Sequence, residues 1–319
     1  MSRTSPLPRY APFALLLIAA ASPVYAHEGR PAAPHDLWHA WELDPVVTVP
    51  LVLTAVLYGA GVRRLWRAAA PGRGVRRREV AAFAIGWATL AGALISPLHA
   101  LGGVLFSAHM TQHELVMVVA TPLLVLGRPL VAFIWAFPPA GRRRMASWVR
   151  WPALRSAWLA VSRLTVAWWV HAAAICVWHL PVLYELTLVS AAAHAAQHAS
   201  FVGSALLFWW ALFNPGREGY GVAVVYLFGA LILTGALGAL LTFAPTLWYE
   251  AYAATSGSWG LTPLDDQQLG GIIMWIPGGI SYLVAGLALF AQWLRESELR
   301  ARHRERGLLA ASAGSCGRV

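Results

Sequence analysis

Residues 109–126 read HMTQHELVMVVATPLLVL, and together with the five residues before them they decide the fold of this 319-residue chain. The whole run, 104–126, is predominantly apolar and contains one charged residue, Glu114. About 20 such residues in a helix cross the hydrocarbon core of a bilayer. Histidine and glutamate are costly inside a membrane, so their presence in this run indicates a function as well as a fold.

Six further apolar segments resemble this one. The chain is 58% hydrophobic and 12% charged, which argues against a soluble protein. The sequence predicts an all-α, polytopic membrane helix bundle at 45–293. Its seven transmembrane helices lie at about 45–62, 79–96, 104–126, 164–180, 193–213, 222–243 and 268–292.

The N-terminus has the pattern of a secretory signal peptide. Arg3 and Arg9 form the basic region, residues 10–21 the apolar run, and Ala26 ends a small-residue cleavage site. We therefore expect a signal peptide at 1–26, with an uncleaved anchor as the alternative. An extracytoplasmic segment at 27–44 precedes the seven-helix domain, and an arginine-rich tail at 294–319 follows it.

The basic residues are distributed on one side of the predicted spans. The chain has no lysine, and all of its 24 basic residues except Arg3, Arg9 and Arg30 fall in alternate connections or the tail. The positive-inside rule then places the mature N-terminus outside and the C-terminus in the cytoplasm of a bacterial plasma membrane. The pI near 10.4 follows from this excess and does not indicate a nucleic-acid partner.

Two segments between the third and fourth spans are expected at the membrane surface. Residues 130–137 are too few for an eighth span, since eight helical residues rise only about 12 Å. Residues 147–162 carry three tryptophans among arginines, which is typical of a helix in contact with lipid headgroups.

The histidines are distributed oppositely to the arginines. Ten of the 11 histidines, all except His303, lie outside or in the outer parts of spans. Three pairs have HxxxH spacing: 35/39, 109/113 and 194/198. Residues four apart share a helix face with Cβ atoms about 5–6 Å apart, so two imidazoles can reach one metal ion.

The spans thus predict a copper site at the outer face. Its proposed ligands are His109, His113, His194 and His198, with Met117 one turn further along and His179 near the outer end of the fourth span. Imidazole and thioether are suitable ligands for copper, the thioether especially for Cu(I). The alternative is that these histidines hydrogen-bond one another and the backbone to hold the bundle together. His171, deeper in the fourth span, is expected to pack or to relay protons.

Several other polar residues leave alternatives open. Cleavage after Ala26 would expose His27 as a copper-chelating N-terminus assisted by His35 or His39, whereas a solvated tail would bind nothing. Asp265 and Asp266 are expected to cap a helix, with metal access or partner docking as the alternative. Glu114 could balance a bound cation or pack in protonated form. The 277–279 Pro-Gly-Gly stretch predicts either a break or a kink in the last span.

Several motifs, in this order, resemble the CtaG family of polytopic bacterial cytochrome c oxidase assembly factors. They are HMTQH (109–113), ATPL (120–123), LGRP (126–129), WHLP (178–181), DQQLGG (266–271) and MWIPGG (274–279). The resemblance covers about residues 36–293. It implies a plasma-membrane protein that matures a copper–haem oxidase, by helping copper to reach the catalytic subunit. Cytochrome c oxidase subunits are then the expected partners, with a copper donor protein as a further one.

One position departs from the family pattern. The second intramembrane pair usually reads His-x-x-Glu-His, and here Gln197 takes the glutamate position. A neutral amide can hydrogen-bond but cannot offset the charge of a cation. The change therefore disfavours tight Cu(II) binding more than a transient Cu(I) site.

The expected function is reversible copper binding by an assembly factor that catalyses no reaction. The sequence contains no nucleophile–base set, phosphate loop or dinucleotide fingerprint. Three alternatives stay open: a haem-binding membrane cytochrome, a copper or proton transporter, and a purely structural scaffold for oxidase folding.

Overall fold

The computed structural model describes residues 34–216 and 218–316, and within them it contains helices and no strand. The predicted all-α class is confirmed. The predicted signal peptide at 1–26 and the start of the segment at 27–44 lie outside the described residues.

Each predicted span falls within a helical stretch. The main helices are α2 (Pro45–Ala69), α3 (Arg77–Ile95), α5 (Phe106–Glu114) with η2 (Leu115–Ala120) and α6 (Thr121–Leu126), α10 (Leu164–Trp178), α12 (Ala191–Phe213), α13 (Gly219–Thr242) and α14 (Pro263–Cys316). Shorter elements are η1 (Leu37–His39), α4 (Pro97–Gly102), α7 (Pro129–Trp135), α8 (Pro139–Val149), α9 (Pro152–Val161), α11 (Pro181–Val189), η3 (Glu250–Tyr252) and η4 (Ser256–Trp259).

The helices identify a multi-pass membrane protein, but length and composition support a smaller number of spans than seven. In the described part of the chain, 4 helices are long and apolar enough to cross a bilayer, or up to 6 if each of two bent pairs is one span. Helix α12 is not among them, and it carries His194, Gln197 and His198 in its first half. The count of seven therefore stays a prediction.

Helix starts follow the sequence signals closely. Asp44 accepts a hydrogen bond from the backbone N–H of Val46 at 2.8 Å, and a proline opens α2 directly after it. Ser96 and Ser190 cap α4 and α12 in the same way. These caps satisfy backbone donors that would otherwise lack partners, and so fix where each helix enters the bundle.

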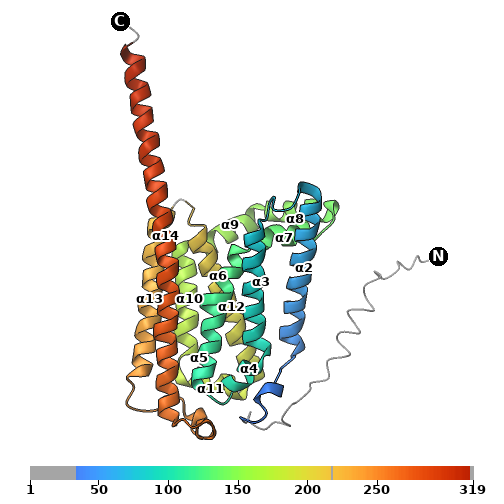
Figure 1. Ribbon diagram of the computed structural model, residues 1–319, viewed down its shortest axis with the longest axis vertical. Coiled ribbons are helices and arrows are strands. Elements are labelled where there is room, and N and C mark those ends of the chain that lie inside the picture. The colour runs from blue at the N-terminus through green and yellow to red at the C-terminus, as the bar shows by residue number, and fades with distance from the viewer. Residues whose placement is uncertain (1–33, 217, 317–319) are drawn as a thin grey trace, which may run out of the picture.

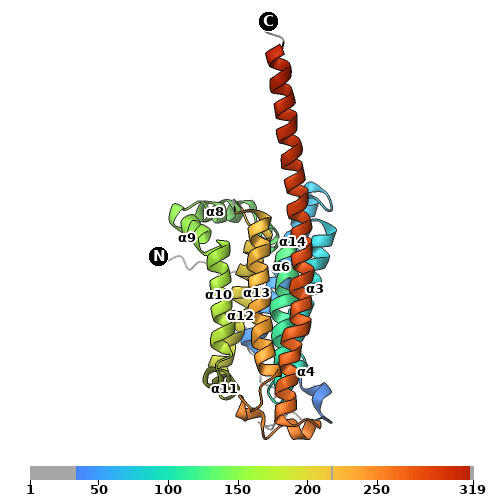
Figure 2. The ribbon, with the colours of Figure 1, turned by 90° about the vertical axis from the view of Figure 1, so that its left-hand side faces the viewer.

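The long helices run side by side and form one bundle (Figures 1 and 2). Helices α7, α8 and α9 lie across one end of the bundle, whereas α4 and α11 lie at the other. The bends that produce this arrangement are 54° between α6 and α7 and 64° between α9 and α10. The short segment expected at 130–137 is thus a helix that turns away from the preceding span.

The arginine-rich connections lie at the α7–α9 end. They comprise the turn between α2 and α3 and helices α8 and α9, and α14 extends beyond the bundle on the same side (Figure 1). The connections that contain α4, α11 and the segment before α14 lie at the opposite end and carry no arginine. Arginines and most histidines are therefore separated in space as they are in the sequence.

Helix α14 packs closely along α13. A Cβ atom on Gly238 would lie 2.9 Å from the carbonyl oxygen of Gly271, so only small residues allow this approach. Helix α14 also continues through Pro277 without an unwound stretch. Of the two alternatives for this stretch, the break in the span is therefore wrong.

A widened turn separates α5 from α6. Residues 115–120 form a π-helix, in which each backbone hydrogen bond spans one residue more than in an α-helix. Side chains satisfy the carbonyl of Met117, which accepts hydrogen bonds from Trp209 Nε1 at 2.8 Å and Thr121 Oγ1 at 2.6 Å. The turn is thereby held by α12 as well as by its own helix.

Candidate metal centre

Five histidines meet at the end of the bundle that carries α4. His99 comes from α4, His109 and His113 from α5, and His194 and His198 from α12. We call these residues the histidine cluster. Four of the six predicted copper ligands belong to it.

The two HxxxH pairs face each other across the helix interface. Ring centroids lie 4.3 Å apart in the His109–His113 pair and 4.6 Å apart in the His194–His198 pair. Between helices, the His109–His194 distance is 5.8 Å and the His113–His198 distance is 5.5 Å. Helical spacing aligned each pair, and helix packing brought the pairs together.

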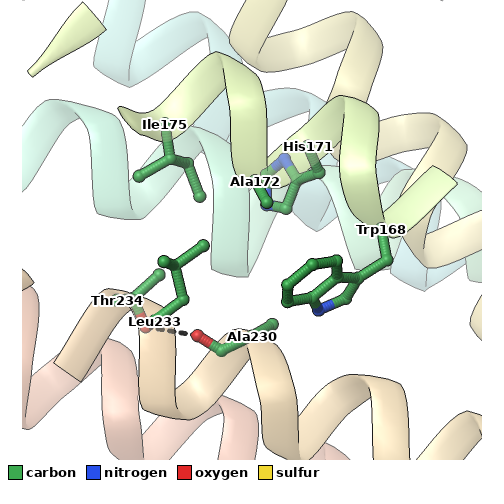
Figure 3. A pocket seen from close by; sticks show the side chains of 7 residues that line it. All are labelled: Trp168, His171, Ala172, Ile175, Ala230, Leu233 and Thr234. Atoms are coloured by element: carbon green, nitrogen blue, oxygen red, sulfur yellow. Dashed lines mark hydrogen bonds between the residues drawn. The ribbon is translucent and has the colours of Figure 1, made fainter. Parts of the chain in front are cut away.

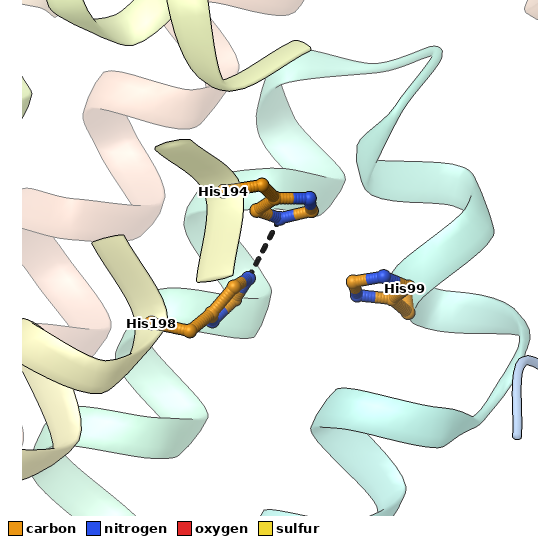
Figure 4. Close-up of side chains that lie close together, drawn as sticks. All are labelled: His99, His194 and His198. Atoms are coloured by element: carbon orange, nitrogen blue, oxygen red, sulfur yellow. Dashed lines mark hydrogen bonds between the residues drawn. The ribbon is translucent and has the colours of Figure 1, made fainter. Parts of the chain in front are cut away.

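His99 completes a group that the sequence alone did not identify. One side-chain nitrogen from each of His99, His194 and His198 lies within 4.8 Å of the others (Figure 4). The Nε2 atoms of His194 and His198 are 2.8 Å apart, and the His99 ring stacks on His194 at 5.1 Å. We call these three residues the outer triad, and His109 with His113 the inner pair. His99 lacks a histidine four residues away, so its only signal was its place beside the outer end of a span.

Several nitrogens of the cluster lack hydrogen-bond partners. Within the described part of the chain these are both ring nitrogens of His113 and Nδ1 of His198, all buried. A buried polar atom left without a partner costs about 1–3 kcal/mol. Histidines that served only to tie the bundle together would be expected to pair these atoms. Unpaired imidazole nitrogens that converge from two helices fit a transition-metal ion.

A tyrosine-rich segment covers one side of the cluster. Tyr252, in η3, donates to the carbonyl of Gly102 at 3.0 Å and lies 3.5 Å from His109 Nδ1. Its hydroxyl also contacts that of Tyr184, on α11, at 2.9 Å. Burial raises the pKa of Tyr252 well above its usual range, so the hydroxyl keeps its proton and remains a donor.

His99 is held at both of its ring nitrogens. Gln112 Nε2 donates to Nδ1 at 2.8 Å, and Nε2 lies 3.3 Å from the Glu42 carboxylate. The hydrogen bond from His99 lowers the pKa of Glu42, which is therefore ionised at neutral pH. Gln112 also donates to the carbonyl of Ala93 at 2.8 Å, which ties this arrangement to α3.

Neither His179 nor Met117 takes part in the contacts that define the cluster, although His179 lies close to His113. His179 Nδ1 contacts the carbonyl of Ile175 at 2.8 Å, and its ring lies 6.5 Å from Phe201. Phe201 in turn lies 4.7 Å from the His113 ring. Met117 is buried in the main apolar core. Copper ligation by either residue stays a prediction.

His171 lies in a different environment. Its Nδ1 contacts Ser204 Oγ at 3.0 Å, and its ring stacks on Phe208 at 5.1 Å. The adjoining pocket between α10 and α13 is apolar and too narrow for a water molecule. Figure 3 shows the side chains that line it: Trp168, His171, Ala172, Ile175, Ala230, Leu233 and Thr234. These contacts favour the packing role of the two predicted for His171.

The predicted capping acids have distinct partners. Asp265 pairs with Thr262 in the first turn of α14, at 2.6 Å between side-chain oxygens. Asp266 instead caps α5, because its carboxylate accepts from the backbone N–H groups of Phe106 at 2.7 Å and Ser107 at 3.0 Å. Capping is thus the observed role of Asp266, whereas at the start of α14 the Thr262 hydroxyl accepts from the Asp265 N–H and donates to the Asp265 carboxylate.

Glu114 and Gln197 are buried near the inner pair. Glu114 points at α14, where a Cβ atom on Gly278 would lie 2.6 Å from its Oε2. Gln197 has no exposed surface, and its side chain lies within hydrogen-bonding reach of the His109 ring. Gln197, the position at which this chain departs from the family pattern, therefore adjoins the histidine cluster.

The predicted chelate at His27 lies outside the described residues. Of its suggested helpers, His35 is exposed and contacts Asp36 at 2.9 Å, whereas His39 ends η1. Helix η1 packs against α4, which carries His99.

The fold and this centre define a helical, multi-pass membrane protein with a nitrogen-rich group at one end of its bundle. Residues 56–296 match the family described as cytochrome c oxidase caa3 assembly factor, Caa3_CtaG. The match covers most of the chain, and the protein belongs to this family. The resemblance noted in the sequence is thereby confirmed.

The curated relatives that match are longer proteins without an assigned role. An uncharacterised protein of Mycobacterium bovis is 26% identical over 278 residues, which cover 83% of this chain and 41% of the relative. An uncharacterised protein of Mycobacterium leprae is 24% identical over 265 residues, 80% of this chain and 40% of the relative. The chain thus spans about two fifths of their length. No solved structure matches it at a significant level.

Proposed function

We propose that this assembly factor binds copper reversibly at the histidine cluster and passes it to the catalytic subunit of cytochrome c oxidase. One observation carries the proposal. Two HxxxH pairs from separate helices converge with His99 in one group, and several of their buried nitrogens lack hydrogen-bond partners. Copper is the cargo of this site and not a permanent component of it.

The composition of the cluster favours a transient site. Imidazole suits copper in both oxidation states. Among the described residues, no carboxylate pairs with His109 or His113, and neutral Gln197 adjoins the inner pair in place of an acid. A site that neutralises little of the ion's charge is expected to release it to a partner more readily.

The distribution of arginines supports the direction in which the cluster faces. The arginine-rich connections and the extended end of α14 lie at the opposite end of the bundle. By the positive-inside rule the cluster then opens to the outer side of a bacterial plasma membrane, with the C-terminus in the cytoplasm. Copper from a donor protein outside the cell membrane could be received there.

The test compares copper bound by the purified full-length chain and by the His109→Ala/His113→Ala variant. We expect the wild type to bind copper and the variant to lose most of it while inserting normally. His171→Ala is the matched control, because it removes another buried histidine outside the cluster. It should bind as the wild type does.

The same variants are then assayed in cells for the copper content and activity of the oxidase. Both should fall in the double variant and not in the control. Normal oxidase copper in cells that contain only the double variant would contradict the proposal. A Soret band in the purified protein would instead favour the haem alternative.

A further inference from the structure

The side chains of the histidine cluster become progressively less exposed from one side to the other. The Glu42 side chain is 53% exposed and that of His99 17% exposed, whereas His109 and His113 retain only 1% and 2% of their surface. His194 and His198 are intermediate. The Glu42–His99 contact is therefore the most accessible part of the centre.

The opposite side of the centre is closed. Tyr184 and Tyr252 are fully buried against His109, and their hydroxyl groups contact each other. Thr255, which directly precedes η4, donates to the carbonyl of Val104 at 2.8 Å and fastens this tyrosine-rich segment to the residues just before α5. An ion that approached from this side would have to displace packed aromatic rings.

The position of Glu42 is fixed independently of its side chain. Its backbone N–H donates to the carbonyl of Ile95, the last residue of α3, at 3.1 Å. The carboxylate is thus anchored at the rim of the bundle, within reach of His99. Among the described ion pairs, the one that involves a cluster histidine is formed by Glu42 with His99.

We infer that copper reaches the cluster past Glu42 and His99, displaces one of the two contacts that hold the His99 ring as the outer triad binds it, and then moves to the inner pair. This inference rests on the proposed copper function. The carboxylate attracts the cation to the rim. The arginines lie at the other end of the bundle, and salt screens charges that are separated by more than about one Debye length, so they repel the ion little. Imidazole is a better ligand for copper than carboxylate, so the ion moves inward along nitrogens.

The geometry of the cluster supplies a continuous route for this transfer. His99 lies 5.1 Å from His194, and His194 lies 5.8 Å from His109, measured between ring centroids. His198 lies 5.5 Å from His113. Each step is short enough for one ligand to be exchanged for the next while others still hold the ion. Glu42 accordingly affects the rate at which copper is captured, whereas the histidine nitrogens determine how much copper is bound.

The test measures the association rate of Cu(II) with the purified full chain by stopped-flow tryptophan quenching. The parent protein for these measurements carries His27→Ala, His35→Ala and His39→Ala, so that the N-terminal segment cannot chelate the probe. All further variants are made in this parent. Glu42→Gln should lower the association rate about threefold to tenfold, as expected for loss of a steering charge. Bound copper at saturation should fall far less. The rate difference should shrink as salt is added.

Two control variants separate charge from position. Glu250→Gln removes the same charge from an exposed residue in the connection before α14, at the same end of the bundle but outside the Glu42–His99 contact, and should leave the rate unchanged. Glu42→Asp retains the charge and should recover most of the rate. Equal rates for Glu42→Gln and the parent would overturn this inference while the proposed function stands. A parent protein that binds no copper would overturn the proposed function itself.

Discussion

Asp266 accepts a hydrogen bond from the backbone N–H of Phe106 at 2.7 Å, although the two residues are 160 positions apart. The same carboxylate binds the backbone N–H of Ser107 at 3.0 Å and its hydroxyl at 2.5 Å. The last helix of the bundle therefore caps the helix that carries the inner pair. A carboxylate at a helix N-terminus also interacts favourably with the helix dipole.

We expect Asp266→Asn to destabilise the protein and to weaken copper binding. The amide loses the charge of a buried acceptor that bonds three donors, which costs about 1–3 kcal/mol. Asp265→Asn is the matched control, since Asp265 is exposed and bonds within its own turn. Thermal unfolding in detergent measures both variants. Equal midpoints would show that the contact does not stabilise α5.

Gln197→Glu should raise the affinity for Cu(II) roughly tenfold, because it places a negative charge beside the His109 ring. The same buried charge should lower the stability of the copper-free protein. Competition with a chelator measures the affinity, and thermal unfolding with and without copper measures the stability. Gln268→Glu, which adds an acid near the start of α14, should change the affinity little. Unchanged Cu(II) affinity in Gln197→Glu would refute this role of position 197.

Gly278→Ala should be less stable than Gly279→Ala by about 1–3 kcal/mol. The added methyl group would lie 2.6 Å from Glu114 Oε2, whereas at Gly279 the nearest atom is Leu231 Cδ1 at 3.5 Å. Alanine favours a helix at both positions equally, so the difference isolates the Glu114 contact. Thermal midpoints of the two variants measure it. The prediction fails if replacing Glu114 with alanine does not restore part of the stability of Gly278→Ala.

The sequence predicted much of this arrangement because its signals were local. Apolar runs gave the helices, and four-residue spacing placed His109 with His113 and His194 with His198 on common faces. In each case the interacting residues lie within one turn of a helix.

Contacts between distant segments could not be obtained in this way. His99 joins the cluster only because the short helix α4 turns it toward α12. Asp266 was expected to cap a helix, but the identity of that helix depends on how α14 packs against α5. Helix α14 remains continuous at Pro277, although the local sequence equally allowed a break.

The widened turn at residues 115–120 sets the direction in which the histidines point. An α-helix rotates about 100° per residue, so a turn that accommodates one extra residue shifts the two halves of the span relative to each other by about that angle. The α6 half can then keep its packing face while the α5 half presents His109 and His113 to α12. Removing one residue from this turn would leave a more regular helix whose histidine face was aimed at the wrong neighbour.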